Sequence, residues 1–251
     1  MADTQIMQAG LLAAIGLLAG FVNVLAGGGS LLTLPVLIFL GLPAATANGT
    51  NRIAILIQNI FAVGSFRRHG VLPLRLALLC TAPALLGSYL GANLAVTIDE
   101  LLFQRLLACI MLGVLLFNTL DPMKRWHREE LLLSPWRIVA LLLCFFGIGI
   151  YGGFVQAGVG FLIITALLIH GLDLVRVNAV KVFVICIFTL IALMVFIRHG
   201  QVNYGLGLAL AVGNAIGGSI ATRMAVSKGH DWIKKVVSVT VLAFAIKLLF
   251  S

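Results

Sequence analysis

The tripeptide Arg68-His69-Gly70 recurs as Arg198-His199-Gly200, 130 residues further along the chain. The same shift aligns residues on both sides of it: Gly41 with Gly171, Asn48 with Asn178, Gly87 with Gly217, Ala95 with Ala225 and Arg105 with Lys235. Only the beginning differs, because Gly20-Phe21-Val22-Asn23 matches Gly153-Phe154-Val155-Gln156 at a shift of 133. One register kept over so long a stretch predicts two copies of one ancestral unit.

The composition indicates that this repeated unit lies in a membrane. Hydrophobic residues make up 61% of the 251 residues and charged residues 10%, against about 25% charged residues in water-soluble domains. Apolar stretches near the length that crosses about 30 Å of hydrocarbon recur throughout. We therefore predict an all-α integral membrane protein with homologous helical repeats at 1–120 and 137–251 and a cytoplasmic linker at 121–136. Each repeat has about five hydrophobic segments, in the first 6–26, 31–47, 52–66, 73–97 and 101–120.

The second segment is short and carries Pro35 and Pro43, so its length does not decide whether it crosses or re-enters. If all five segments cross, the second repeat is inverted; if the short one only re-enters, the repeats are expected to be parallel. Lys and Arg concentrate on the cytoplasmic side of membranes. A parallel arrangement would place Arg223 and Lys228 on the outer side of the membrane. Loop charge therefore favours inverted repeats with an outside N-terminus. That arrangement leaves chiefly Arg52, Lys181 and Arg198 outside, and makes these residues cytoplasmic: Arg67, Arg68, Arg75, Lys124, Arg125, Arg128, Arg137, Arg176, Arg223, Lys228, Lys234 and Lys235.

Charge and motifs exclude several functions. The net charge of +9 does not indicate nucleic-acid binding, because Lys and Arg lie beside helix ends rather than on one polar face. The eight acids fall in the terminus, loops or segment ends, which disfavours a carboxylate proton relay. HExxH, GxSxG and P-loop motifs are absent, so we expect no enzymatic activity. Four single cysteines in apolar runs predict neither a metal site nor a cofactor: Cys80, Cys109, Cys144 and Cys186.

Glycine clusters interrupt both repeats. Gly27-Gly28-Gly29-Ser30 lies between two apolar segments, and Gln156-Ala157-Gly158-Val159-Gly160 lies at the matching place. Such runs break helices and free backbone N–H groups, which a membrane tolerates only where they are buried in protein or line a polar cavity. A helix beginning near Ser30 would point its positive end at an anion. The matching positions favour two broken or re-entrant helices. Isolated glycines spaced by four are instead typical of helix packing: Gly87, Gly91, Gly213 and Gly217.

Polar residues follow each cluster at the opening of the third segment. The first repeat has Asn48, Thr50, Asn51 and Arg52, and the second has Asn178 and Lys181 at the positions of Asn48 and Asn51. A tetrahedral anion is held by several fixed donors, so these amides and cations are candidates for completing an anion site. The alternative is that Arg52 anchors the interface and that the asparagines cap or connect helices. His69 and His199 are more typical of interfacial loops than of a proton relay.

At these residues the chain resembles the sulfite exporter TauE/SafE family, within the toluene sulfonate uptake permeases. Gly27-Gly28-Gly29-Ser30 with Pro35 resembles the signature of the family's first half, and Gly152-Gly153-Phe154 with Asn178-Ala179 resembles that of its second copy. The resemblance covers nearly the whole chain and implies a multi-pass permease of the cell (inner) membrane. It further implies a substrate among sulfur-containing anions such as sulfite or organosulfonates.

Together these features predict a secondary transporter in which two broken helices offer backbone N–H groups to a small anion. The predicted substrate-binding residues are Gly27, Gly28, Gly29, Ser30, Asn48, Asn51, Arg52, Gln156, Gly158, Gly160, Asn178 and Lys181. Alternating access would follow from movement of one helical bundle against the other. A passive anion channel and a non-transporting membrane scaffold are the alternatives. The partners we expect are the lipid bilayer and a small anion, and a homodimer is one assembly left open.

Overall fold

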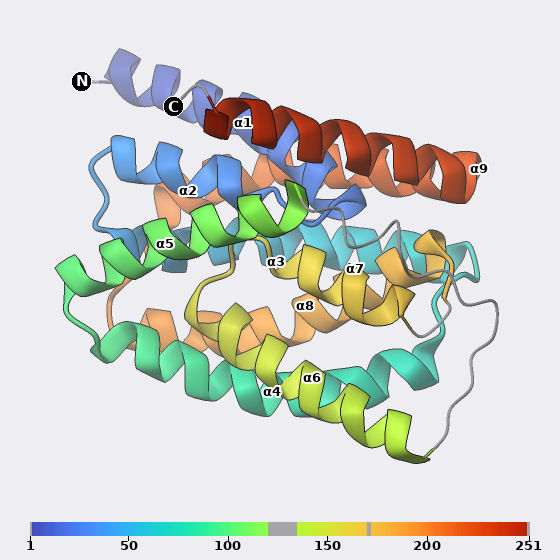
Figure 1. The fold of residues 1–251 in the computed structure, drawn as a ribbon. Coiled ribbons are helices and arrows are strands. Elements are labelled where there is room, and N and C mark those ends of the chain that lie inside the picture. The colour runs from blue at the N-terminus through green and yellow to red at the C-terminus, as the bar shows by residue number, and fades with distance from the viewer. Residues whose placement is uncertain (1, 120–134, 170–171, 250–251) are drawn as a thin grey trace.

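The computed structural model describes residues 2–119, 135–169 and 172–249, and within them it is entirely helical, as predicted (Figure 1). The predicted linker at 121–136 lies almost wholly outside the described residues. The helices are α1 (Ala2–Leu25), α2 (Ser30–Phe39), α3 (Ala44–Arg68), α4 (Leu74–Thr97), α5 (Glu100–Thr119), α6 (Pro135–Phe154), α7 (Val159–Leu168), α8 (Leu174–Arg198) and α9 (Tyr204–Leu249). A kink at Gly229, where φ is +72°, turns the last part of α9 back along the bundle.

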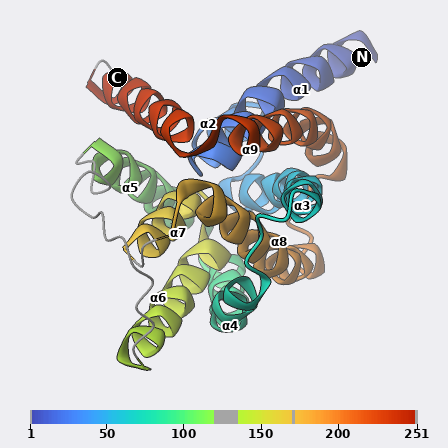
Figure 2. The ribbon, with the colours of Figure 1, turned by 90° about the vertical axis from the view of Figure 1, so that its right-hand side faces the viewer.

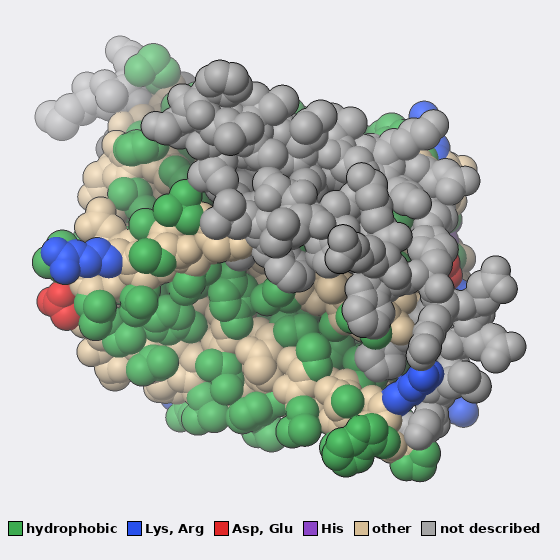
Figure 3. Space-filling view, in the orientation of Figure 1, with side chains coloured by type: hydrophobic (Ala, Val, Ile, Leu, Met, Phe, Trp, Pro, Cys, Tyr) green, Lys and Arg blue, Asp and Glu red, His purple; other side chains and the backbone are tan. Residues whose placement is uncertain are grey.

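The exterior fits a bilayer. Within the described residues, five stretches are long and apolar enough to cross a membrane: Met7–Leu25, Leu74–Thr97, Pro135–Phe154, Leu174–Arg198 and Tyr204–Gly229. On the part of the face that Figure 3 colours, hydrophobic side chains lie between the two ends, and the charged side chains lie towards those ends. Since every backbone N–H and C=O must be satisfied in lipid, helices are the form this composition can take there. The protein is therefore a multi-pass membrane protein.

Helices α1 and α2 form a hairpin that enters and leaves at the same end of the molecule (Figure 1). Gly27, with φ +87°, permits the reversal between them. Helix α2 has 10 residues, which span about 15 Å, roughly half of the hydrocarbon thickness. The predicted segment 31–47 is therefore too long: the helix ends at Phe39, Gly41 takes a φ of +90°, and α3 begins at Ala44 after Pro43. Helices α6 and α7 form a similar hairpin from the opposite end, with α7 also 10 residues long.

Spaced glycines bring two parallel helix pairs into backbone contact, as their spacing predicted. A Cβ at Gly213 would meet Ala13 and Leu17 of α1, and one at Gly217 would meet Leu17, so α1 runs parallel to the first part of α9. In the same way Gly87 meets Phe146 and Gly91 meets Ile150, so α4 runs parallel to α6. Figure 2 shows these pairs on opposite sides of α3 and α8. Small residues are what permits such close approach.

Helices α3 and α8 cross the centre in opposite directions. Gly49, near the start of α3, packs on Phe196, near the end of α8. Lys181, near the start of α8, instead bonds the backbone of Asn23, whose amide bonds Gln58 in the second half of α3.

The expectation that a re-entrant short segment makes the two halves parallel is therefore wrong. In each half the first helix turns back together with the short one, because both belong to one hairpin that returns to its starting end. Helices α3, α4 and α5 then follow one another in alternating directions (Figure 1). As a result, α6 begins at the end of the molecule opposite to the end at which α1 begins.

Candidate functional site: two opposed helix hairpins

The tips of the two hairpins meet in the interior. A Cβ added to Gly27 would lie 2.5 Å from backbone atoms of Gly160, and one on Gly160 would collide with Gly27. The first hydrogen bonds of the short helices run from Leu31 N to Gly28 O and from Phe161 N to Gly158 O, both at 3.0 Å. The backbone N–H groups that precede them lie at the positive ends of α2 and α7. The structure thus brings the two predicted glycine clusters together.

Asn51 fixes the beginning of α2. Its Nδ2 donates to Ser30 Oγ at 3.0 Å, and its Oδ1 accepts from Thr33 Oγ1 at 2.7 Å. All three residues are buried. Both ends of the Asn51 amide therefore bond protein groups, and the residue orients the hairpin.

Arg52 is wholly buried and binds the carboxyl end of α6. Its two terminal nitrogens donate to Gly152 O at 3.1 Å and to Gly153 O at 2.6 Å, and its guanidinium carbon lies 4.8 Å from the centre of the Phe196 ring. Its Nε has no hydrogen-bond partner among the described residues. The interfacial-anchor alternative is therefore wrong, because Arg52 lies two turns inside α3 at 0% exposure.

Lys181 makes the corresponding contact with the carboxyl end of α1. Its Nζ donates to Asn23 O at 3.0 Å, Val24 O at 2.5 Å and Asn178 Oδ1 at 2.6 Å. These bonds use all three donors of the ammonium group. Lys181 lies in the interior of the protein, with an exposure of 1%. A cation at a helix C-terminus faces the negative end of the helix dipole, which partly offsets the cost of burying the charge.

The remaining predicted side chains lie beside these contacts. Asn48 Nδ2 donates to Phe154 O at 2.8 Å, while its Oδ1 has no partner in the described part of the chain. Gln156 donates to Thr189 Oγ1 at 2.6 Å. Asn178 Nδ2 likewise lacks a partner among the residues described. The predicted set is thus gathered around the hairpin tips, but most of its donors bind protein.

Three further buried amides were not among the predicted ligands. Asn59 and Asn214 have both side-chain atoms, and Gln58 its Nε2, without partners in the described residues. All three are 0% exposed and lie on α3 or α9. Polar residues inside apolar runs were the available signal, but interhelical hydrogen bonding explains such residues equally well. Only the structure shows that these amides are unpaired.

The buried polar residues around the hairpin tips, together with Arg52 and Lys181, form a polar layer, and buried negative charge is lacking among the described residues. Among the residues whose burial is described, every buried charged side chain is a cation, and none of the described Asp or Glu residues is buried. The described residues also contain no group of three His, Cys, Asp or Glu side chains placed to hold a metal ion. Two buried cations provide positive charge that can accommodate an anion.

A family model described as sulfite exporter TauE/SafE matches residues 12–248. The chain belongs to this family of membrane transporters. It is 26% identical to a Haemophilus influenzae protein over 249 residues, which cover 99% of this chain and 97% of the relative. It is 27% identical over 242 residues to YfcA of Escherichia coli K12, covering 96% of this chain and 89% of the relative.

A Sinorhizobium protein, ORF9, is 27% identical over 233 residues, with 92% of this chain and 88% of the relative covered. All three relatives are named probable membrane transporter proteins. No solved structure matches the chain. The family confirms the resemblance drawn from the glycine clusters and makes the protein a transporter rather than an enzyme.

Proposed function

We propose that the protein carries a small oxyanion across the membrane, namely a sulfur oxyanion or an organosulfonate such as sulfite or sulfoacetate. The observation that carries this proposal is the burial of Arg52 and Lys181 in a layer without a buried carboxylate among the described residues. The helix ends that they contact offset only about half an elementary charge each. The N-termini of α2 and α7 add positive charge of similar size. The layer therefore keeps a net charge on the order of two positive units, which suits a divalent oxyanion.

The donors at this layer suit an oxyanion. Arg52 Nε and Asn178 Nδ2 are buried without partners in the described residues, and both belong to helices that touch the hairpin ends. Fixed N–H donors replace the hydration shell of an oxyanion, and charge-assisted hydrogen bonds are about twice as strong as neutral ones. In this proposal Arg52 contacts the anion, and Lys181 positions α1.

We further infer that the two halves are an inverted duplication that works by alternating access. The opposite directions of α3 and α8 support this inference, as do hairpins α1–α2 and α6–α7, which enter from opposite ends. Each cation joins the two halves, because Arg52 binds α6 and Lys181 binds α1. Separation of the hairpin tips would open the layer to one side at a time.

Charge at the helix ends supports a cytoplasmic position for the end with the α3–α4 turn. This end carries Arg67, Arg68, Arg75, Arg137, Arg176, Arg223 and Lys228, whereas the opposite end carries Arg198 and Arg105 with Asp99 and Glu100. The N-terminus then lies outside.

Counterflow into liposomes that contain the purified protein tests the proposed function. Sulfite, sulfate, thiosulfate, sulfoacetate and acetate are compared as the internal anion that drives uptake of the same labelled external anion. We expect exchange with at least one sulfur anion and little with acetate. Downhill flux without counterflow would instead indicate a channel, and absence of flux with every anion would indicate a scaffold; either result contradicts the proposal.

A further inference from the structure

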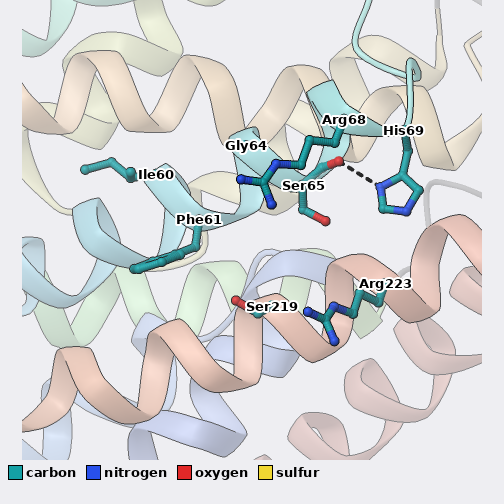
Figure 4. Close-up of a pocket in the computed structure, with 8 residues that line it drawn as sticks. All are labelled: Ile60, Phe61, Gly64, Ser65, Arg68, His69, Ser219 and Arg223. Atoms are coloured by element: carbon teal, nitrogen blue, oxygen red, sulfur yellow. Dashed lines mark hydrogen bonds between the residues drawn. The ribbon is translucent and has the colours of Figure 1, made fainter.

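A second basic cavity opens between α3 and α9, away from the hairpin tips. It has a volume of about 340 Å³ and is lined by Ile60, Phe61, Gly64, Ser65, Arg68, His69, Ser219 and Arg223. Small-molecule pockets measure about 300–1,000 Å³, so the cavity is large enough for a small ion with part of its hydration shell. Figure 4 shows that Arg68 and Arg223 extend from facing helices toward the gap between them.

The cavity is chemically suited to an anion. Two guanidinium groups and two serine hydroxyls line it, and its lining contains no carboxylate. The Nδ1 of His69 hydrogen-bonds to Ser65 O at 2.8 Å, which holds the ring at the cavity's edge (Figure 4). Guanidinium groups match oxyanions because their planar N–H donors bind two oxygens at once.

The cavity also differs from the other basic pocket near this end of the molecule. That pocket is lined by two arginines and otherwise by apolar residues: Pro73, Leu74, Arg75, Leu76, Leu79, Leu172 and Arg176. The serine hydroxyls of the α3–α9 cavity have no counterpart there. Hydroxyl donors beside guanidinium groups favour a hydrated oxyanion over an acyl chain.

Position connects the cavity with the buried amides. Gly218, beside Ser219, packs on the side chain of Gln58, and a Cβ there would lie 2.6 Å from Gln58 Cγ. Gln58, Phe61, Ser65 and Arg68 follow one another at helical spacing on the same face of α3. The cavity therefore lies beside the buried amide of Gln58.

We propose that the α3–α9 cavity is a second anion site, which takes a tetrahedral oxyanion at the cytoplasmic end. A soluble sulfate or sulfonate and the phosphate of an anionic lipid share this chemistry. If the ligand is soluble, the cavity is the first binding site that the transported anion meets on the cytoplasmic side. This role rests on the proposed function. Arg68 and Arg223 contact the anion directly.

The test is equilibrium titration of purified full-length protein with sulfate, together with native mass spectrometry in phosphatidylglycerol. The variants are Arg68→Gln and Arg223→Gln, and the control is Arg198→Gln. Arg198 matches Arg68 in the other half, is exposed, and lies at the opposite end of the bundle. We expect sulfate binding at this site to weaken about tenfold or more in both cavity variants and to be unchanged in the control.

Arg52→Gln separates this proposal from the proposed function. Wild type should bind sulfate at two sites, Arg68→Gln only at the central one, and Arg52→Gln only at the cavity. A wild type with one site that Arg68→Gln abolishes would contradict the central site and leave the cavity supported. Loss of bound phosphatidylglycerol in the cavity variants, with sulfate binding unchanged, would assign the site to a lipid phosphate. Sulfate and lipid binding that are both unchanged in Arg68→Gln and Arg223→Gln would overturn the proposal.

Discussion

The two hairpin ends occupy matching places but are held by different chemistry. Lys181 caps α1 with two donors and donates its third to Asn178 Oδ1, so all three are bonded. Arg52 caps α6 with two bonds and keeps an unpaired Nε. A lysine whose donors are all used can position a helix, whereas an arginine has five donors and can cap a helix and bind a ligand together. The comparison teaches that similar positions in the two halves carry different roles.

The largest loss of stability is expected for substitutions where the two hairpins touch. Gly27→Ala introduces a side chain at φ +87° and also a collision with Gly160, whereas Gly41→Ala meets the similar φ of +90° with open space around it. Gly27→Ala should destabilise the protein by about 2–5 kcal/mol and Gly41→Ala by about 1–2 kcal/mol. Unfolding in detergent, followed by circular dichroism, measures the difference. Equal losses would show that contact between the hairpin tips does not contribute.

Replacing Lys181 or Arg52 with glutamine tests whether the two cations have different roles. The amide of Lys181→Gln still has two donors for the carbonyls of α1, so counterflow should fall by only a few-fold. Arg52→Gln removes the charge and the unpaired Nε, so counterflow should fall about tenfold or more. Initial counterflow rates, corrected for the amount of protein inserted in liposomes, provide the measurement. A greater loss in Lys181→Gln than in Arg52→Gln would reverse the assigned roles.

Two buried asparagines, Asn51 and Asn178, should differ more modestly in their effect on stability. Asn51 makes two hydrogen bonds that hold α2, whereas Asn178 accepts one from Lys181. Asn51→Ala should therefore lower the free energy of unfolding by about 1–3 kcal/mol, and Asn178→Ala by about 1 kcal/mol. Thermal unfolding of both variants in the same detergent tests the order. Asn178→Ala as the more destabilising change would contradict the assignment of Asn51 to the hairpin.

The smallest loss of stability is expected for substitutions at residues that cap the starts of the helices. Asp173 caps α8 through its own carboxylate, which accepts from Val175 N at 2.9 Å and from Arg176 N at 3.1 Å. Helix α3 begins at Ala44, and its N-cap residue, Pro43, provides no side-chain cap; Glu100 of α5 accepts from Ala44 N and Ala45 N instead. Asp173→Ala should cost about 1 kcal/mol in thermal unfolding. Asp173→Asn, which keeps a capping oxygen, is the control and should cost less.

The two glycine clusters predicted much of the arrangement, because they mark where the chain breaks between α1 and α2 and between α6 and α7. Gly158 and Gly27 both take positive φ, as a helix interruption there requires. The extent of α3 was not predicted, since the third segment was expected to begin at residue 52, whereas the helix begins at Ala44 and includes Asn48 and Asn51. They are helical and buried because their partners, α2 and the end of α6, come from elsewhere in the chain. Such long-range pairing leaves no local pattern.

The most direct test of the central claim is equilibrium titration of wild type and Arg52→Lys with the anion that counterflow selects. Lysine keeps the positive charge but lacks the guanidinium Nε donor and its planar geometry. If Arg52 contacts the anion, Arg52→Lys should remain folded and bind about tenfold more weakly than wild type. Unchanged affinity in a folded Arg52→Lys would contradict an anion site at the opposed hairpins.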